Sequence, residues 1–277
     1  MRTWVNGAIL TDAEQPVLSA LDHGITVGDG VFETVNSFDG VPFALTRHLH
    51  RMSRSAAGLG LPDPDHGVLR DAVAQVLEGT SYARGRIRLT QTGGPGPAGT
   101  DRGDAGPTLI VTAGPQAPSA DTTTVTVVPW TRNERAATAG LKTTSYADNV
   151  IALTYARERT ASEAIFANTQ GMLCEGTGSN LFYVVDGDLV TPTLASGCLA
   201  GITRELVLQW CGALERDAPV EVLEQASEVF VVSTARDVQP VHACERDGRS
   251  WTYDAPGPST SRAREIWSAK LAETLDP

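Results

Sequence analysis

The first part of the chain contains segments whose apolar and polar side chains follow the period of a β-strand. Residues 31–38 and 84–92 alternate between apolar and polar positions, and residues 108–112 are mostly apolar, so three strands are predicted here. The dipeptides Asn6-Gly7 and Asp39-Gly40 are typical of hairpin turns, since Asn, Asp and Gly accept the backbone angles that such turns require.

Between these strands, apolar residues recur every three or four positions, which predicts two helices. The first begins near Thr46, which we expect to cap it, and the second spans about residues 66–78. The predicted apolar faces are Leu49, Met52, Ala56 and Leu59 in the first helix and Val68, Leu69, Val73, Val76 and Leu77 in the second. Residues 93–107 are rich in Gly, Pro and Asp and are predicted to form a long loop that is functional or mobile.

A stretch of small residues and prolines at 113–121 separates this part from the rest of the chain. Beyond it, predicted strands at 123–128, 163–168, 181–185, 221–222 and 229–233 alternate with predicted helices at about 147–160, 203–214 and 260–274. The pattern therefore predicts an α+β protein of two domains. We expect an N-terminal α+β domain at residues 1–115, a linker at 116–122 and a C-terminal domain at 123–277.

Composition and charge narrow the classes of partner. The 277 residues carry a formal net charge of −11, which argues against nucleic acid or an anionic membrane surface as a partner. No apolar run is long enough to span a membrane, and the first residues lack the apolar core of a signal peptide. The four cysteines have no zinc-type spacing, so we expect reduced thiols, a cytoplasmic location and no metal site.

Lysine is rare in this chain. Lys142 and Lys270 are its two lysines among 22 basic residues. A lysine amine can lose its proton and attack a carbonyl group, whereas the guanidinium of arginine stays protonated. Lys270 lies in a charged helical pattern typical of a solvent-exposed face. Lys142 lies in a small, polar stretch before a predicted helix, so it is the candidate for chemistry, although chance placement explains its position equally well.

Four other segments carry groups suited to chemistry. Glu175 precedes a turn of small residues, and Ile202 and Thr203 open a predicted helix whose amides suit an anion. Thr234, after a predicted buried strand, offers a hydroxyl group, and Arg51 offers a guanidinium for phosphate. Each also has an ordinary structural explanation, as a turn, a cap or a solvated charge. Together they suit pyridoxal phosphate, whose aldehyde needs a lysine, whose pyridine nitrogen needs an acid and whose phosphate needs donors.

The order of these motifs resembles that of the fold type IV pyridoxal-phosphate enzymes. That family includes branched-chain and D-amino-acid aminotransferases, (R)-amine transaminases and 4-amino-4-deoxychorismate lyases. The resemblance covers almost the whole chain, from the segment 23–33 through Lys142 to the segment 233–241. The motifs that carry it are His23-Gly-Ile-Thr-Val-Gly-Asp-Gly-Val-Phe-Glu33, His48-x-x-Arg51, Lys142, Asn149, Glu175-Gly-Thr-Gly-Ser-Asn-Leu-Phe182, Gly201-Ile-Thr-Arg204 and Ser233-Thr-Ala-x-x-x-Gln-Pro-Val241.

The resemblance implies the architecture of that family, with a small N-terminal α+β domain and a larger barrel-like C-terminal domain flanked by helices. It implies that Lys142 forms the internal aldimine with pyridoxal phosphate and that Glu175 pairs with the pyridine nitrogen. The phosphate ligands that it implies are Arg51, Ile202, Thr203 and Thr234. It also implies a cofactor buried between the two domains and an active site completed across a homodimer interface.

The resemblance gives weaker indications for the substrate. Phe32, Arg86, Arg88 and Ala235 are candidate substrate contacts, and either arginine can instead form an ion pair at a strand edge. Arg102, in the predicted loop, is a further candidate. The chain lacks the arginine and histidine with which the best-known D-amino-acid enzymes hold the substrate carboxylate. Tyr146 is one position away from a family tyrosine, so it is assigned no role.

We therefore predict an aminotransferase that moves an amino group between an amino acid, or a primary amine, and a 2-oxo acid. The alternative within the family is a 4-amino-4-deoxychorismate lyase that releases p-aminobenzoate and pyruvate. Two alternatives lie outside it, a cofactor-free aldolase that uses Lys142 and a non-catalytic binding protein on an enzyme fold. The sequence does not fix the chirality or the side chain of the substrate.

Overall fold

The chain forms two compact units in the computed structural model, which describes residues 1–12, 15–80 and 82–277. The first unit comprises Met1–Ala117, Leu141–Ser145 and Leu275–Pro277, and the second comprises Pro118–Gly140 and Tyr146–Thr274. The first change of unit, after Ala117, falls within the stretch predicted to be a linker. Both units combine helices with a sheet, as the sequence pattern indicates.

The first unit contains a six-stranded antiparallel sheet with the order β2-β1-β6-β5-β3-β4. Its long central strands coincide with the segments whose side chains alternate in the sequence. The strands are β1 (Arg2–Val5), β2 (Ala8–Ile9), β3 (Gly30–Phe38), β4 (Val41–Pro42), β5 (Arg84–Thr92) and β6 (Thr108–Pro115).

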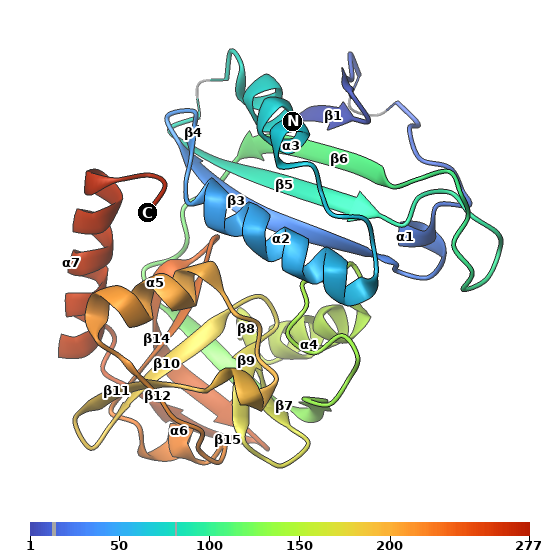
Figure 1. The fold of residues 1–277 in the computed structure, drawn as a ribbon. Coiled ribbons are helices and arrows are strands. Elements are labelled where there is room, and N and C mark those ends of the chain that lie inside the picture. Colours follow the sequence, from blue (N-terminus) through green and yellow to red (C-terminus); the bar gives the residue numbers. More distant parts are fainter. Residues whose placement is uncertain (13–14, 81) are drawn as a thin grey trace. The chain divides into compact units, whose positions relative to one another are not determined.

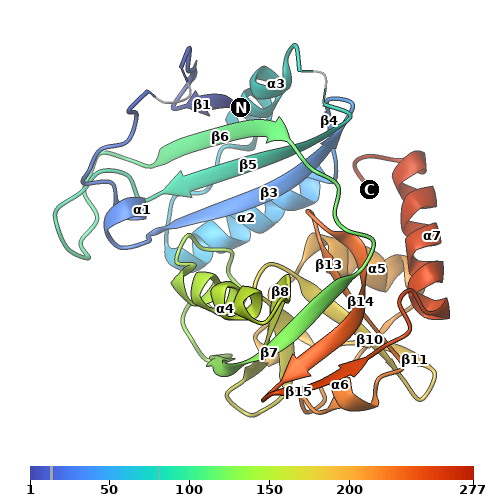
Figure 2. The same cartoon turned by 180° about the vertical axis from the view of Figure 1, so that it is seen from behind.

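The helices of this unit are α1 (His23–Thr26), α2 (Leu45–Leu59) and α3 (His66–Leu77). Helices α2 and α3 cover one face of this sheet, as Figures 1 and 2 show from opposite sides. Leu49 and Met52 of α2 and Leu69 of α3 are buried in one core together with Val31 and Val35 of β3. The apolar faces are as predicted except at Val68, which is exposed, so that assignment was wrong.

The N-terminus of α2 is capped from a distant part of the chain. Its N-cap residue, Ala44, has a positive φ of 54° and provides no side-chain hydrogen bond. Thr46 already lies inside the helix, and its amide donates to Oδ1 of Asp276 at 3.0 Å. The prediction that Thr46 caps the helix was therefore wrong, because the acceptor comes from Asp276.

The second unit contains a nine-stranded mixed sheet with the order β12-β11-β10-β13-β14-β7-β8-β9, and β15 pairs with β14. The strands are β7 (Thr123–Arg132), β8 (Glu163–Asn168), β9 (Leu173–Gly176), β10 (Asn180–Val185), β11 (Asp188–Thr191), β12 (Leu214–Glu215), β13 (Glu228–Ser233), β14 (Asp237–Arg246) and β15 (Arg249–Thr252). The amide of Gly176, at the end of β9, donates to the carbonyl of Ser179, just before β10, at 2.8 Å. The sheet thus curls back on itself.

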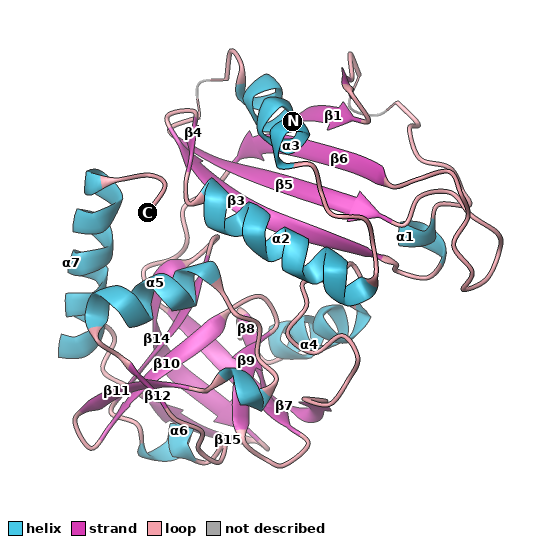
Figure 3. Ribbon diagram, viewed as in Figure 1, coloured by secondary structure: helices cyan, strands magenta, loops and turns pink. Residues whose placement is uncertain are grey.

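Helices flank this curled sheet (Figure 3), and they are α4 (Ala147–Glu158), the 3₁₀ helix η1 (Leu194–Ser196), α5 (Ile202–Cys211), α6 (Val222–Gln225) and α7 (Pro258–Glu273). The predicted strand at 221–222 was wrong, because the amide of Ala226 donates to the carbonyl of Val222 and closes a helical turn. Within the described residues, no helix is both long and apolar enough to cross a membrane.

Candidate active site

Lys142 is attached to the sheet of the first unit. Its segment, Leu141–Ser145, belongs to that unit although its neighbours on both sides in the sequence belong to the second. The amide of Phe32 donates to the carbonyl of Lys142 at 3.0 Å, and the amide of Thr144 donates to that of Gly30 at 2.8 Å. This differs from the expectation that Lys142 belongs to the C-terminal domain, because these hydrogen bonds attach its segment to β3.

The amine of Lys142 lies beside two of the predicted substrate contacts. Its Nζ is 4.4 Å from the centroid of the Phe32 ring, and the guanidinium carbon of Arg88 is 3.8 Å from the same centroid. The main chain of Lys142 is held by its amide, which donates to Oγ of Ser55 at 3.1 Å. Arg86 is exposed and lies on the same face of β5 as Arg88. The fold therefore brings Lys142, Phe32 and Arg88 together.

Arg51, a predicted phosphate ligand, belongs to a buried cluster with Glu33 and His48. Its Nε donates to Oε1 of Glu33 at 2.8 Å, and its Nη2 donates to Oε2 at 2.6 Å. Nδ1 of His48 lies 2.7 Å from the same Oε2. The carboxylate of Glu33 thus orients the guanidinium of Arg51 with two hydrogen bonds. The role of Arg51 as a phosphate ligand stays a prediction.

The electrostatics of this cluster keep the carboxylate charged and the imidazole neutral. Burial by itself raises the pKa of Glu33, but the positive charge and hydrogen bonds of Arg51, with the hydrogen bond of His48, outweigh it and lower the pKa to about 2. Burial lowers the pKa of His48, and the positive charges of Arg51 and Lys142 add to this effect, against the opposing influence of Glu33.

The sequence analysis assigned no role to Glu33 or His48, although the pattern contained a signal for both. Glu33 lies between Val31 and Val35 on the side of β3 that faces the helices, so the alternation places a charge in the core. A buried charge requires a partner. His48 and Arg51 are three residues apart on the buried face of α2, where helical spacing presents both side chains to the sheet.

Glu175 is held by two groups of the second unit. Its Oε1 lies 3.2 Å from Nε of Arg132, and its Oε2 accepts the amide of Leu199 at 2.9 Å. The side chain of Glu175 is 13% exposed, so this ion pair is largely shielded from water. A guanidinium and an amide both favour the charged form of a carboxylate. The arrangement therefore suits an anion that is to hold a proton-bearing nitrogen.

Arg132 is a site residue that the sequence analysis missed. It lies at the end of β7, its guanidinium carbon is 4.3 Å from the centroid of the Phe166 ring, and its Nη1 donates to Oδ1 of Asn149 at 3.2 Å. Nδ2 of Asn149 in turn donates to the carbonyl of Thr177 at 2.5 Å. Glu175 and Thr177 both belong to residues 175–179, called the acid turn below. Arg132 contacts this turn at Glu175, and Asn149 contacts it at Thr177.

The helix predicted to open after Gly201 is present in the second unit as α5, and its role in binding an anion stays a prediction. Gly201 is the N-cap of α5 and, as a glycine, provides no side-chain hydrogen bond to the first turn of the helix. A Cβ atom at position 201 would lie 2.0 Å from Oδ1 of Asn180, so the close approach requires glycine. Ile202 and Thr203 occupy the first turn, where amide groups and the helix dipole favour an anion.

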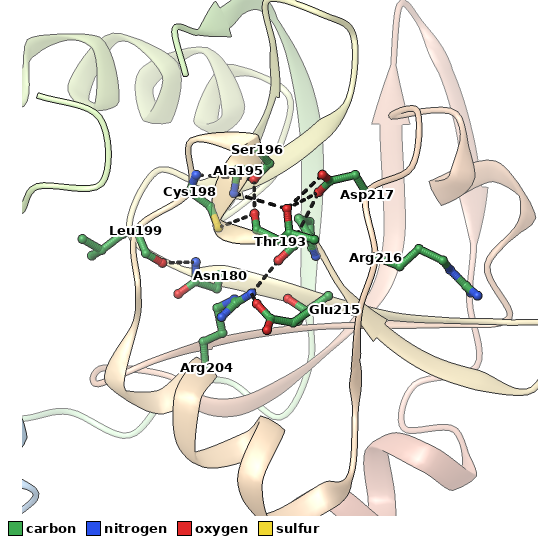
Figure 4. Close-up of polar contacts among 12 residues, drawn as sticks. Asn180, Thr193, Ala195, Ser196, Cys198, Leu199, Arg204, Glu215, Arg216 and Asp217 are labelled. Atoms are coloured by element: carbon green, nitrogen blue, oxygen red, sulfur yellow. Dashed lines mark hydrogen bonds and ion pairs between the residues drawn. The ribbon is translucent and has the colours of Figure 1, made fainter. Parts of the chain in front are cut away.

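The loop before α5 is tied down by a polar network, which Figure 4 shows in close-up. The hydroxyl of Thr193 donates to the carboxylate of Asp217, with oxygen distances of 2.9 and 2.8 Å. Nη2 of Arg204 donates to the carbonyl of Pro192 at 2.6 Å and to Oε1 of Glu215 at 2.5 Å. Nδ2 of Asn180 donates to the carbonyl of Leu199 at 2.9 Å. Since the amide of Leu199 contacts Glu175, one loop connects the acid to the start of α5.

Thr234 and Ala235 lie in the turn between β13 and β14, here called the hydroxyl turn (residues 233–236). The amide of Arg236 donates to the carbonyl of Ser233 at 3.1 Å, and Oγ of Ser119 donates to the carbonyl of Ala235 at 2.9 Å. The turn is therefore fixed from within and from Ser119. The contacts of Thr234 and Ala235 with cofactor and substrate stay predictions.

Arg102 is committed to structural contacts in the first unit. Its Nε and Nη2 each lie 2.6 Å from a carboxylate oxygen of Asp29, and its Nη1 and Nη2 donate to the carbonyls of Gly60 and Leu59 at 2.8 Å. The hydrogen bonds of Asp29 raise the pKa of Arg102. Arg102 thus ties the loop 93–107 to the end of α2, and its role as a substrate contact stays a prediction.

The chain belongs to the aminotransferase class IV family, whose model matches residues 30–244. The predicted family, the α+β fold type IV architecture and the prediction of a pyridoxal-phosphate-dependent aminotransferase of this class are thereby confirmed. The predicted transfer of an amino group between an amino acid and a 2-oxo acid is also confirmed.

Individual proteins resemble the chain over nearly its full length. It is 32% identical to a putative branched-chain-amino-acid aminotransferase of Methanocaldococcus jannaschii, over 96% of this chain and 94% of that protein. It is 29% identical to a D-alanine aminotransferase of Bacillus licheniformis, over 99% of both. The solved structure of a hypothetical aminotransferase from Mycobacterium tuberculosis, in its PLP-bound form, superposes with a TM-score of 0.85 at 26% identity over 99% of both chains.

Proposed function

We propose that this aminotransferase uses pyridoxal phosphate as its own cofactor and Lys142 as its catalytic amine. The observation that carries the proposal is the placement of Lys142, whose main chain is fixed to β3 and Ser55 and whose Nζ lies over the Phe32 ring. A nucleophilic amine needs such a fixed position. Lys270, by contrast, forms a surface ion pair with Glu273 at 2.6 Å.

The residues of the second unit fit the remaining parts of the cofactor. Glu175, held by Arg132 and the amide of Leu199, suits the pyridine nitrogen. The first turn of α5, with Ile202 and Thr203, suits the phosphate, and we propose that Thr234 of the same unit adds a hydroxyl and Arg51 of the first unit a charge. When bound, pyridoxal phosphate supplies a carbonyl carbon that bonds to amines and a ring that accepts an electron pair.

The chain's own groups then perform the proton transfers. Nζ of Lys142 would hold the cofactor's carbonyl carbon and, once an amino substrate has replaced it there, would accept the proton of the substrate Cα and return it. Glu175 would keep the pyridine nitrogen protonated, so that the ring can accept the electron pair.

We propose Arg88 as the contact of the substrate carboxylate and Phe32 as a wall of the substrate site, since both lie beside Lys142. Arg86, on the same face of β5, and Ala235, in the hydroxyl turn, are weaker candidates. The relatives' names point to two kinds of substrate, branched-chain amino acids and D-alanine. A donor panel of L- and D-amino acids and (R)-phenylethylamine, each with a 2-oxo acid, would identify the preferred one.

Borohydride reduction followed by peptide mapping tests the lysine directly. We expect the pyridoxyl label on Lys142, and label on Lys270 alone, or on neither, would contradict the proposal. The lyase alternative predicts release of p-aminobenzoate from aminodeoxychorismate without a 2-oxo acid. The homodimer that the family resemblance implies is a further proposal, and light scattering of the purified protein tests it.

A further inference from the structure

The second unit contains a buried carboxylate that the proposed chemistry does not use. Glu163, the first residue of β8, is 2% exposed. Its Oε1 accepts the amide of Thr177 at 3.0 Å and the hydroxyl of the same residue, and its Oε2 accepts the hydroxyl of Ser179 at 2.9 Å. Burying a charge is costly unless hydrogen bonds and an opposite charge satisfy it. Glu163 has both, because Nε of Arg236 lies 3.5 Å from its Oε2.

On one side, Glu163 shapes the acid turn. Thr177 and Ser179 are the two residues of this turn that bind it, and Glu175 begins the same turn. At Gly176 a Cβ atom would lie 2.4 Å from Oγ of Ser179 and 3.1 Å from Cδ of Glu163. The backbone after Glu175 is therefore packed directly against this carboxylate.

On the other side, Glu163 contacts the hydroxyl turn through Arg236. The guanidinium of Arg236 also donates to the carbonyl of Ser162 at 2.8 Å and to the side chain of Gln239. The amide of Arg236 closes the turn by donating to Ser233. Arg236 follows Thr234 and Ala235 directly in the sequence, so its fixed side chain limits where those two residues can lie.

We propose that Glu163 is a positioning residue that fixes the acid turn and the hydroxyl turn in position relative to each other. This inference rests on the proposed function, in which Glu175 would hold the pyridine nitrogen and Thr234 the phosphate of pyridoxal phosphate. Oε1 of Glu163 accepts hydrogen bonds from Thr177 in the acid turn. Oε2 contacts both Ser179 of the acid turn and Arg236 of the hydroxyl turn. A displacement of the acid turn therefore breaks hydrogen bonds at Glu163, and a displacement of the hydroxyl turn breaks its ion pair with Arg236, which links the two turns energetically.

Glu228 provides a matched control. It is also a buried carboxylate of the second unit, 4% exposed, and it accepts the amides of Ser259 and Thr260 at 2.9 and 2.8 Å and the hydroxyl of Thr260 at 2.7 Å. These contacts hold the N-terminal turn of α7, and none of them involves the acid turn or the hydroxyl turn. Glu228→Gln therefore reports the cost of losing a buried carboxylate without moving either turn.

The test uses the apo forms of three full-length proteins, the wild type, Glu163→Gln and Glu228→Gln. Absorbance titration measures how tightly each binds pyridoxal phosphate. We expect Glu163→Gln to raise the dissociation constant about tenfold, because a glutamine has one accepting oxygen and no charge, so it cannot keep the hydrogen bonds of both Thr177 and Ser179 together with the ion pair to Arg236. Glu228→Gln should bind like the wild type even though it unfolds more easily. Thermal unfolding of the same apo proteins separates the two effects.

Pyridoxal without phosphate provides a second readout. If both turns move, Glu163→Gln weakens the binding of pyridoxal and weakens that of pyridoxal phosphate further. Equal affinities of Glu163→Gln and Glu228→Gln for pyridoxal phosphate would overturn the inference, and so would a loss confined to one of the two ligands. A wild-type protein that binds neither ligand would instead contradict the proposed function.

If Glu163→Gln does not fold, a double-mutant cycle tests the same link from the outside. Thr177→Val alters the acid turn and Arg236→Gln alters the hydroxyl turn. We expect their effects on the affinity for pyridoxal phosphate to be non-additive, because both act through Glu163. Strictly additive effects would show that the two turns are independent.

Discussion

The carboxylate of Glu33 and the guanidinium of Arg51 form a bidentate ion pair in the core of the first unit, with N–O distances of 2.8 and 2.6 Å. Glu33→Gln removes the negative charge and leaves the guanidinium of Arg51 buried beside a neutral amide. Breaking a buried pair in this way costs about 3 kcal/mol. We expect urea unfolding to show a loss of that order, whereas Glu273→Gln, which removes the exposed partner of Lys270, should cost less than about 1 kcal/mol.

The cluster also predicts how stability depends on pH. The pKa of Glu33 is lowered from 4.5 to about 2, so its contribution is present above pH 4.5 and is lost as the pH falls towards 2. The pKa of His48 is lowered from 6.5, so protonation of the unfolded chain reduces stability as the pH falls below 6.5. In His48→Asn the decline just below pH 6.5 should be smaller than in wild type, measured by urea unfolding at several pH values. His50→Asn, at an exposed position, is the control, and an unchanged profile in His48→Asn would contradict this assignment.

Lys142→Arg tests the amine without removing the positive charge. A guanidinium cannot bond to the carbonyl carbon or accept the Cα proton, so we expect transamination to fall by at least about 10³-fold, within the range for loss of a general base. Lys270→Arg should retain wild-type activity. Substantial turnover by Lys142→Arg would show that another group carries the chemistry.

Arg88→Gln tests the proposed contact with the substrate carboxylate. A hydrogen bond to a charged group contributes about 1.5–3 kcal/mol, so KM for an amino acid should rise about ten- to a hundredfold. KM for (R)-phenylethylamine, which has no carboxylate, should change little if it is a substrate. Arg86→Gln is the matched change on the same face of β5. Equal effects on amino acids and amines would indicate that Arg88 acts only by packing on Phe32.

Asp276→Ala tests the capping of α2. The aspartate accepts both the amide and the hydroxyl of Thr46, and loss of an N-cap costs about 1 kcal/mol. Urea unfolding should show this loss, while Asp101→Ala, in the exposed part of the loop 93–107, should be close to neutral. A neutral Asp276→Ala would mean that water replaces the cap without cost.

Local periodicity predicted most of the elements, because hydrophobic spacing is a property of neighbouring residues. Strand β5 has the predicted bounds, and the core face of α2 is confirmed. The short strand predicted at 221–222 failed locally, whereas two other features depend on distant partners. The cap of α2 comes from a residue 230 positions away, and Arg132 acquires its role by meeting Glu175 of another strand. No local pattern contains such pairs.

In the candidate site, too, some residues could be predicted from local motifs and others depend on distant contacts. Ordered motifs identified Lys142, Glu175 and the start of α5 in the sequence. The contacts of Glu163 emerged only in the fold, since they depend on which strands and turns become neighbours. The ion pair of Arg102 with Asp29 is likewise visible only in the fold, because the two residues are 73 positions apart.

The attachment of Leu141–Ser145 to β3 has a practical consequence for dissecting this protein. A fragment that ends at Ala117 contains all six strands of the first sheet but lacks this segment, so the backbone of β3 at Gly30–Phe32 is left without its hydrogen-bonding neighbour. An unpaired strand edge invites association with other chains. We expect such a fragment to aggregate and to recover solubility when a peptide spanning residues 141–145 is supplied or fused. The segment that carries the proposed catalytic lysine thus also protects the edge of the strand to which it is hydrogen-bonded.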